Sequence, residues 1–143
     1  GGSYQFENCT FSGTGQNEAV ALSNFASNGI QGSYGDLEQA NFSNCIIYGG
    51  KSNEILLNNE NAASFNFLFE NCLLRTTLNT DTSTYANCIT DMGPSFDFTA
   101  DNPFSLSINS PCVGAGLANG LTEDLYCKSH NSPKDIGAVA YQN

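Results

Sequence analysis

A short pattern of apolar and polar positions recurs four times in the first 90 residues of the chain. Each copy reads aromatic, any residue, Asn, Cys, any residue and then an apolar residue, and the last copy ends in Thr instead. The copies span Phe6–Phe11, Phe42–Ile47, Phe69–Leu74 and Tyr85–Thr90. Recurrence of one pattern along a chain is typical of repeat architectures, in which each repeat buries its apolar face against its neighbours.

The apolar positions change register at the Asn of each copy. In the third copy they are Phe65, Phe67 and Phe69 before the Asn, and Cys72 and Leu74 after it. Side chains alternate between the two faces of a strand, so both sets can face one core only if the chain bends between them. Asn is the non-glycine residue that best tolerates a left-handed backbone at a bend. We therefore predict corners at Asn8, Asn44, Asn71 and Asn87.

The interval from Cys45 to Cys72 gives the length of one repeat, 27 residues. It contains three apolar runs, at residues 45–48, 54–57 and 65–69, which predict three short strands. Strands that stack on their counterparts in the next repeat describe an all-β fold, a right-handed parallel β-helix of about three coils, because parallel crossovers are right-handed.

The other intervals differ from this length. The 36 residues from Cys9 to Cys45 contain a surplus at Ser27–Glu38, which is rich in turn residues and predicts a loop that leaves the body. Its flank, residues 19–25, is predicted to stack against residues 54–57. The 16 residues from Cys72 to Cys88 are too few for three strands, so the helix narrows or ends there.

After residue 92 the repeat disappears and prolines follow at Pro94, Pro103 and Pro111. Proline is excluded from interior ladder positions, so we predict an irregular cap. The expected organisation is a single domain, with β-helix coils at residues 1–92 and a C-terminal cap at residues 93–143 packed on the last coil. The stretch Asp135–Tyr141 is predicted to supply one last strand.

The charge composition restricts the classes of partner that the chain can bind. The chain has four Lys and Arg against 14 Asp and Glu, a formal net charge of −10, which argues against nucleic acid or an anionic membrane. Neutral glycans and divalent cations are compatible with this charge. The sequence contains no apolar run of ~18 residues, the length needed to span a bilayer. The start Gly1-Gly2-Ser3 resembles an internal cut or a tag remnant rather than a signal peptide.

Six cysteines in an extracellular chain would normally indicate a disulfide framework. Four of them, however, occupy the same inward position of successive repeats, which favours a buried stack of free thiols. These are Cys9, Cys45, Cys72 and Cys88. The remaining pair, Cys112 and Cys127, could form a bridge within the cap.

The chain also resembles a known family. The Asn-Cys coils, followed by Pro94-Ser95-Phe96, the stretch Ser110–Gly116 and Asp135-Ile136-Gly137-Ala138, look like the C-terminal part of bacterial surface proteins with a pectin-lyase-like right-handed β-helix, including the choice-of-anchor group. The chain departs from the family at Gly114, where the family usually has Asp, and at Val139-Ala140, which replace Tyr-Glu. The resemblance implies an extracytoplasmic protein, at the cell surface or in the periplasm.

A pectin-lyase-like fold implies a polysaccharide lyase or hydrolase, but the catalytic equipment is missing from the sequence. A lyase needs a cationic base beside carboxylates, and the only cations of the coils, Lys51 and Arg75, have no acidic cluster near them. Asn79-Thr80-Asp81 resembles one hydrolase motif of this fold, yet its partner acids are absent, so Asp81 is interpreted as a turn residue. His130, the only histidine, is expected in a solvent-facing loop. No catalytic, cofactor or metal residue is assigned.

Two weaker candidates concern binding. The cap carboxylates could place oxygens around Ca²⁺, although their spacing matches no known calcium loop and turn carboxylates are the commoner explanation; they are Asp97, Asp101, Asp124 and Asp135. Tyr34, Tyr48 and Phe98 could stack on sugar rings if they are exposed, whereas aromatic residues near repeats are more often core.

These observations favour a non-catalytic C-terminal β-helix segment of an extracytoplasmic bacterial protein, with a structural or glycan-binding role. One alternative is a fragment of a polysaccharide lyase or glycoside hydrolase, which rests on fold analogy alone. Another is an adhesin or spacer. The expected partners are upstream coils of a parent protein or a second copy meeting the first coil end to end, since an uncovered coil exposes strand edges.

Overall fold

The computed structural model describes residues 1–142, which form strands and turns without a helix among them. The strands are β1 (Gly2–Glu7), β2 (Thr10–Gly13), β3 (Val20–Ser23), β4 (Phe25–Ser27), β5 (Gly32–Tyr34), β6 (Leu37–Ser43), β7 (Ile46–Gly49), β8 (Ile55–Asn58), β9 (Phe65–Glu70), β10 (Leu73–Leu74) and β11 (Tyr85–Ala86). The all-β class predicted from the sequence is confirmed. Within this range no helix has the length and apolar character needed to cross a bilayer.

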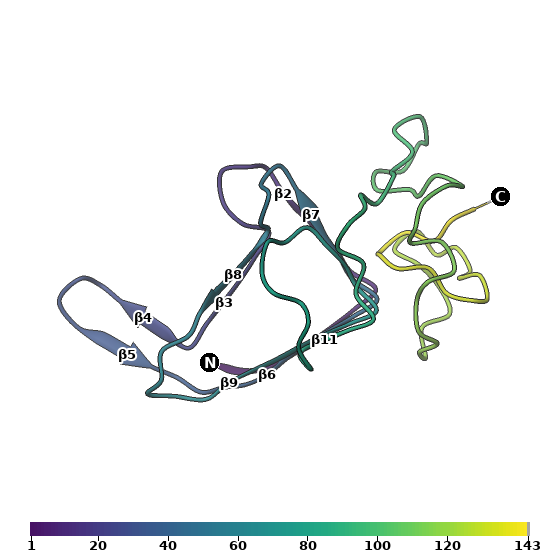
Figure 1. Cartoon of the computed structure of the whole chain (residues 1–143). Helices are drawn as coiled ribbons and strands as arrows, with labels where there is room; N and C mark the ends of the chain where they lie inside the picture. Colours follow the sequence, from purple (N-terminus) through teal and green to yellow (C-terminus); the bar gives the residue numbers. More distant parts are fainter. Residues whose placement is uncertain (143) are drawn as a thin grey trace.

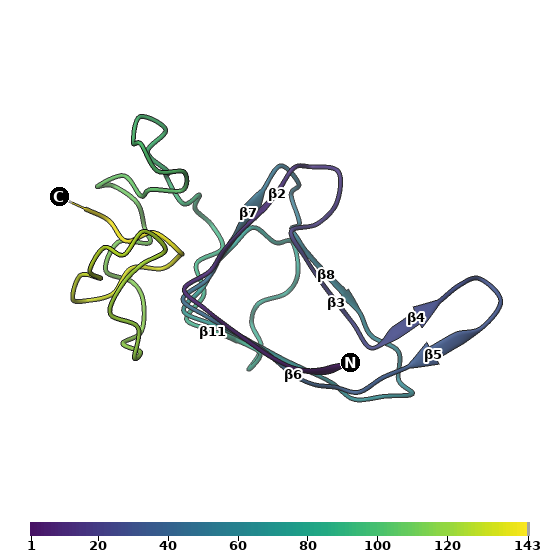
Figure 2. The same ribbon diagram turned by 180° about the vertical axis from the view of Figure 1, so that it is seen from behind.

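The chain passes through three parallel sheets in a fixed order. Sheet A contains β1, β6, β9 and β11, sheet B contains β2, β7 and β10, and sheet C contains β3 and β8. Each strand pairs with its counterpart from the next passage, so that Phe6 lies opposite Phe42 and Phe42 opposite Phe69. In Figures 1 and 2 the three sheets lie along three sides of a common interior. The predicted stacking of residues 19–25 on residues 54–57 is confirmed by the β3–β8 pair.

The four predicted corners are confirmed by the backbone. Asn8, Asn44, Asn71 and Asn87 have φ values of 48°, 52°, 49° and 52°, in the left-handed region. Each separates a strand of sheet A from the strand or bridge position of sheet B that follows it. Asn44 donates to Asn8 Oδ1 at 3.3 Å and Asn87 to Asn71 Oδ1 at 3.5 Å. The amides therefore bond as two pairs, and a further set of bonds reaches the C-terminal part of the chain.

The interior beside these corners is built from stacked rings and stacked thiols. The rings of Phe6, Phe42 and Phe69 follow one another at centroid distances of 4.8 Å, and Tyr85 continues the row at 5.4 Å. Such close parallel rings bury much apolar area while keeping the strands in register. Next to them the thiols of Cys45, Cys72 and Cys88 share one arrangement, in which each donates to a carbonyl oxygen of the preceding passage.

All six cysteines are free in the structure, including Cys112 and Cys127, so the suggested bridge within the cap is not formed. Cys45, Cys72 and Cys112 are fully buried, whereas Cys127 is exposed. Burial raises the pKa of the Cys112 thiol to about 12, which keeps it protonated and unreactive at neutral pH.

Thiol titration tests this arrangement. Under denaturing, non-reducing conditions all six thiols are expected to react, and in the native protein Cys127 is expected to react first because it alone is exposed. A count of four would place a bridge between Cys112 and Cys127. A count of none would replace the thiol stack with a disulfide framework.

The surplus of the first repeat is a hairpin rather than an irregular loop. Strands β4 and β5 pair antiparallel, with Phe25 opposite Tyr34, and the hairpin projects from the body as Figure 1 shows. Its tip is closed by the Asn28 side chain, which accepts bonds from the Ile30 and Gln31 amides. The segment leaves the body as predicted, and the predicted loop takes the form of a two-stranded hairpin.

The part of the chain from residue 93 to residue 142, here called the C-terminal segment, packs against several passages and not against the last one alone. It lies beside the row of corners and reaches all three passages (Figures 1 and 2). Asn8 donates to the Asp135 carbonyl, Asn44 to the Leu117 carbonyl and Asn71 to the Ala115 carbonyl. The segment therefore packs along the side of the sheets, where the polar groups that satisfy it are aligned, and its contact with the last passage, at Ile89, is one part of this packing.

The same packing buries the outer face of sheet B. Ile46 and Leu73 point away from the interior yet are 1% and 0% exposed, because they form a second apolar cluster with Leu106, Cys112 and Ile136 of the C-terminal segment. Sheet B is thus covered on both faces, which is the usual condition of parallel sheets.

The predicted last strand at Asp135–Tyr141 is not formed. The amide of Tyr141 donates to the Asp135 carboxylate and that of Ala140 to the Asp124 carboxylate, so neither is free for a ladder. Gly137 has a φ of 109°, which also interrupts an extended run. Side-chain carboxylates have replaced a neighbouring strand as hydrogen-bond partners here.

Candidate functional site

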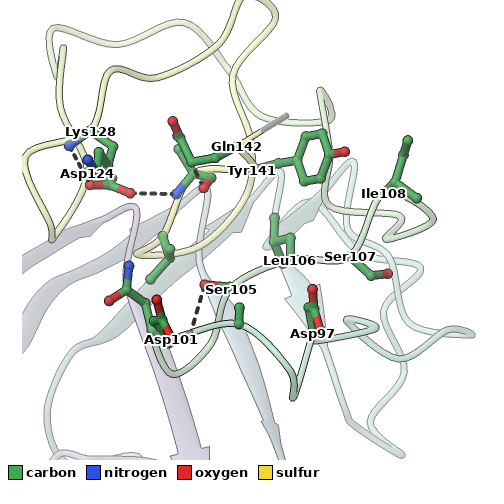
Figure 3. A pocket seen from close by; sticks show the side chains of 14 residues that line it. Asp97, Asp101, Ser105, Leu106, Ser107, Ile108, Asp124, Lys128, Tyr141 and Gln142 are labelled. Carbon is green, nitrogen blue, oxygen red and sulfur yellow. Dashed lines mark hydrogen bonds between the residues drawn. The ribbon is translucent and has the colours of Figure 1, made fainter.

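The C-terminal segment encloses a cavity of about 550 Å³. Three stretches form its walls, residues 97–108, the turn at Asp124–Lys128, and residues 139–142, as Figure 3 shows. A volume of this size is within the range of small-ligand sites. Because all three walls are loops, their positions depend on a few anchoring contacts.

Two backbone hydrogen bonds and one buried side chain hold the first wall, residues 97–108, in place. The amide of Asp97 donates to the Ser105 carbonyl at 2.8 Å and the amide of Ser107 to the Ser95 carbonyl at 3.0 Å, which closes residues 95–107 into a narrow loop. Leu106, 4% exposed, extends from this loop into the apolar cluster behind sheet B. Burial of Leu106 holds the wall against the body, while the polar side chains around it remain on the cavity side.

Asp124 joins the second wall to the third. Its Oδ1 accepts the amides of Tyr126 and Lys128 at 2.8 and 2.9 Å, and its Oδ2 accepts the amide of Ala140 at 3.0 Å. Figure 3 shows Asp124 facing the chain at residues 140–142 across this contact. Both oxygens are used by the backbone, so Asp124 is a structural carboxylate of the cavity wall.

Asp97 and Asp101 keep more of their acceptor capacity. Asp97 Oδ1 accepts the amide and hydroxyl of Thr99, and these bonds, the hydroxyl first, lower the pKa of Asp97. Asp101 is exposed, and its carboxylate accepts no hydrogen bond from the residues that the structure describes. The cavity therefore presents at least one carboxylate that is available to a ligand.

The remaining lining mixes hydrogen-bonding groups with apolar surface. Hydroxyls, amides and one ammonium group come from Ser105, Ser107, Asn102, Gln142 and Lys128, and apolar area comes from Leu106, Ile108, Val139 and Tyr141. Carboxylates accept strong hydrogen bonds from hydroxyl groups, and apolar or aromatic faces pack against the C–H face of a ring. A polyhydroxylated ligand matches both properties, and three lining carboxylates against one ammonium group disfavour an anionic one.

The four cap carboxylates do not converge. Asp97, Asp101 and Asp124 line the cavity, but Asp135 is fully buried elsewhere, where its carboxylate accepts the amides of Gly114 and Tyr141. Gly114, at a φ of 66°, occupies the left-handed region at this contact. Among residues 1–142 no three His, Cys, Asp or Glu side chains group as metal ligands. Asp97, Asp124 and Asp135 thus accept backbone amides, whereas Asp101 accepts none from the described residues.

The cations of the strand region are occupied by local contacts. Arg75 Nη1 donates to the Gly49 carbonyl at 2.6 Å, and its guanidinium lies 5.0 Å from the centre of the Tyr48 ring. Lys51 pairs with Glu18 at 2.5 Å. Asp81 lies in a turn, with its amide bonded to Asn79 Oδ1, as the sequence predicts.

The candidate aromatic residues also lie apart. Tyr48 packs in the cluster behind sheet B, Tyr34 lies on the projecting hairpin against Phe25 at 5.1 Å, and Phe98 is 92% exposed on the loop of the first cavity wall. Only Phe98 stands near the cavity, between the lining residues Asp97 and Ala100. An aromatic platform of several residues is not present in the described part of the chain.

His130 is not the solvent-facing residue that the sequence predicts. It is half-buried in a second cavity, of about 590 Å³, that lies between residues 6–11 and the C-terminal segment. Burial and then the charge of Lys134 lower the pKa of His130, which favours the neutral imidazole at pH 7. Its neighbours there are mostly apolar, among them Phe6, Phe11 and Leu125.

Sequence reasoning missed Tyr141, Lys128 and the serines of the cavity, because nothing in their local spacing marks them as a group. They come together only when residues 97–108 fold back against residues 124–142. The alternation of Pro, Asn and Asp in this region predicts turns but not which turns meet. No protein-family model matches the chain, and none of the curated proteins matches it either.

Proposed function

We propose that this chain is a non-catalytic segment of a right-handed parallel β-helix and that its C-terminal segment binds a neutral glycan. The observation that carries the glycan proposal is the cavity of about 550 Å³, in which carboxylate and hydroxyl groups face apolar surface (Figure 3). The proposed setting is the outside of a bacterial cell, at the surface or in the periplasm, and a structural role for the coils accompanies the binding role of the segment.

The order of the strands supports the β-helix. The first two passages visit sheets A, B and C in turn, the third visits sheets A and B, and the counterpart strands of successive passages pair in parallel. Left-handed Asn corners, stacked rings and stacked thiols repeat at one position of every passage. These features agree with the pectin-lyase-like resemblance of the sequence, which is the reason for proposing a surface or periplasmic role.

The charge of the protein supports a neutral ligand. A formal net charge of −10 and the three carboxylates of the cavity repel uronic acids and other anionic sugars. Hydroxyl groups of a neutral sugar can instead donate to Asp97 and Asp101. Ile108, 69% exposed at the cavity rim, offers an apolar face for the ring.

Replacing Asp101 with alanine is expected to weaken glycan binding about tenfold, since a hydrogen bond to a charged group contributes roughly 1.5–3 kcal/mol. The ligand is first identified on a glycan array that carries neutral and acidic glycans, and its affinity is then measured by calorimetry. Asp81→Ala is the matched control, because it removes one exposed carboxylate of a turn outside the cavity. Equal affinity for both variants would contradict the assignment of the cavity.

The alternative functions give different results in the same experiments. A lyase or hydrolase fragment would release unsaturated or reducing ends from polysaccharides, and loss of that activity in Arg75→Ala would overturn the non-catalytic proposal. An adhesin that recognises protein, or a spacer, would show no saturable binding on the array. We expect saturable binding of a neutral glycan and no product release.

A further inference from the structure

Groups of opposite charge face each other across the cavity in the C-terminal segment. Residues 97–108 supply the carboxylates of Asp97 and Asp101, which accept hydrogen bonds and donate none. The facing stretches supply the Lys128 ammonium group, which only donates, and the Gln142 amide, which does both. Figure 3 shows Asp97 and Asp101 on one side of the cavity and Lys128 and Gln142 on the other. A ligand that spans the cavity therefore meets charged acceptors on one wall and a charged donor on the other.

Hydrogen-bonding capacity remains on both of these walls. The Asp101 carboxylate accepts no hydrogen bond from the described residues. Lys128 donates to Asp124 through its backbone amide, but its exposed ammonium group forms no hydrogen bond or ion pair with residues 1–142. Asp124, beside Lys128, uses both carboxylate oxygens to accept backbone amides. The cavity thus offers an acceptor on one wall and a donor on the other, which matches an uncharged ligand that carries both kinds of group.

Apolar side chains lie beside the donors of the second and third walls. Val139 and Tyr141 line the cavity from the same stretch as Gln142 and face the loop that carries Leu106. A substituent that binds to this side must therefore combine an acceptor with an apolar part. An acetamido group has this composition, because its carbonyl oxygen accepts, its N–H donates and its methyl group is apolar. A hydroxyl group at the same ring carbon is shorter and has no apolar part.

We propose, resting on the glycan function proposed above, that the sugar bound in this cavity is an N-acetylated hexosamine and that Lys128 determines this specificity. The Lys128 ammonium group donates to the acetamido carbonyl oxygen, a charge-assisted hydrogen bond. The acetamido methyl group packs on the side of the cavity formed by Val139 and Tyr141, and ring hydroxyl groups donate to Asp101 on the other side. A sugar without the acetamido group leaves Lys128 and this apolar surface without these contacts.

Charged relatives of this sugar fit the cavity less well. A free amino group lacks both the carbonyl oxygen and the methyl group, and in its protonated form it repels Lys128. A carboxylate on the sugar, as in uronic acids or in the lactyl-bearing sugar of peptidoglycan, meets three lining carboxylates and a formal net charge of −10. A chitin-type oligosaccharide, in which every sugar is N-acetylated and none is charged, is therefore the expected ligand.

The experiment is calorimetry of the wild-type chain with two matched tetrasaccharides, one of the chitin type and one of the cellulose type. The two share ring, linkage and length and differ only in the acetamido group. The chitin-type tetrasaccharide is expected to bind about tenfold more tightly or better. Its fully deacetylated form and a peptidoglycan tetrasaccharide are expected to bind more weakly than it does. All affinities are measured at high salt, which screens nonspecific attraction to the net charge of the protein.

Substitutions of Lys128 test its role separately. Lys128→Met keeps the aliphatic stem and the backbone amide that donates to Asp124, and it is expected to reduce the preference for the chitin type to about twofold or less. Lys128→Arg keeps a charged donor and is expected to retain the preference. Lys51→Met is the control, because it removes one ammonium group outside the cavity, where Lys51 pairs with Glu18. This variant is expected to bind like the wild type.

The outcomes separate this proposal from the glycan function. Equal affinity of the wild type for both tetrasaccharides overturns the N-acetylhexosamine specificity and leaves glycan binding in place. No binding of any oligosaccharide overturns both. A preference that survives in Lys128→Met, or that is lost in Lys128→Arg or in Lys51→Met, overturns the role of Lys128.

Discussion

Replacing Gly49 with alanine is expected to destabilise the protein by about 3 kcal/mol or more, one of the largest effects of any single substitution in the chain. Gly49 is the last residue of β7 and lies against β2. A Cβ atom at this position would contact the Glu54 carboxylate and approach the carbonyl oxygen and amide nitrogen of Gly13 to 2.5 and 2.7 Å. Backbone atoms of a paired strand cannot move aside cheaply, so the strand pair itself must separate.

The Glu54 carboxylate increases the cost. Glu54 is fully buried, and it accepts the amides of Ala19 at 3.0 Å and Lys51 at 2.8 Å. If the alanine methyl group displaces this carboxylate, two amides lose their acceptor and a buried charge loses its donors, each of which costs about 1–3 kcal/mol. The small residues Gly13 and Gly49 thus make the space that Glu54 fills.

The matched control is Gly120→Ala. A Cβ atom added at Gly120 would meet no other atom within 4 Å, and the residue has no left-handed φ. This change is therefore expected to be neutral or slightly stabilising through the unfolded state. Chemical denaturation of both variants and of Glu54→Ala measures the difference. A Gly49→Ala protein as stable as the wild type would mean that Glu54 is not held between the two glycines.

The repeat was predictable because its signal is local. The change of apolar register at each Asn and the tolerance of Asn for positive φ are enough to place Asn8, Asn44, Asn71 and Asn87 at corners, and the structure has them there. The burial of Glu54 in the same region was not predicted from the sequence. Glu54 appears in the sequence as the polar start of an apolar run, and its burial depends in part on the Ala19 amide and on Gly13, which come from the preceding passage.

The C-terminal segment was predicted less well because its partners are distant in sequence. Prolines and glycines after residue 92 correctly exclude regular ladders, but they do not indicate which surface the segment covers. That surface is determined by Ile46 and Leu73, whose side chains lie on the outer face of sheet B, and by the side-chain amide of Asn44 at the corner beside it. In the repeat pattern these residues occupy positions that alternation alone assigns to solvent or to a ladder.

The position of the candidate cavity also depends on contacts between residues that are distant in sequence. Asp97, Asp101 and Asp124 can be identified from the sequence as acids of the cap, whereas the separation of Asp124 from Asp135 follows from the different backbone amides that these two carboxylates accept. Asp135 lies at the contact with Asn8, whose amide donates to its carbonyl. The position of the cavity therefore depends on how the C-terminal segment is fastened to the corners.

Replacing Asn44 with alanine is expected to loosen that attachment and to cost about 3–4 kcal/mol. Asn44 is fully buried. Its side chain donates to the Leu117 carbonyl at 2.9 Å and accepts the Leu117 amide at 2.7 Å, while its own carbonyl accepts the Gly137 amide. Alanine leaves the carbonyl and the amide of Leu117 without partners. It also has to adopt a φ of 52°, a left-handed conformation that Gly and Asn adopt at lower cost.

The other corners provide a graded series. Asn71 is half-buried and donates to the Ala115 carbonyl at 3.2 Å, so Asn71→Ala is expected to cost about 1–3 kcal/mol. Asn87 is exposed and bonds only to Asn71 among the described residues, so Asn87→Ala is expected to cost about 1 kcal/mol, from backbone strain alone. Asn44→Gly keeps the left-handed backbone and separates strain from lost hydrogen bonds.

Thermal melts measure the loss of stability in these corner variants, and limited proteolysis measures whether the C-terminal segment has loosened. If the hydrogen bonds to Leu117 fasten the C-terminal segment, Asn44→Ala and Asn44→Gly both become sensitive to cleavage after residue 93, because each loses these bonds. Asn87→Ala is expected to resist cleavage like the wild type. Equal protection of all these variants would show that the apolar cluster around Leu106 and Ile136 holds the segment without the corner amides.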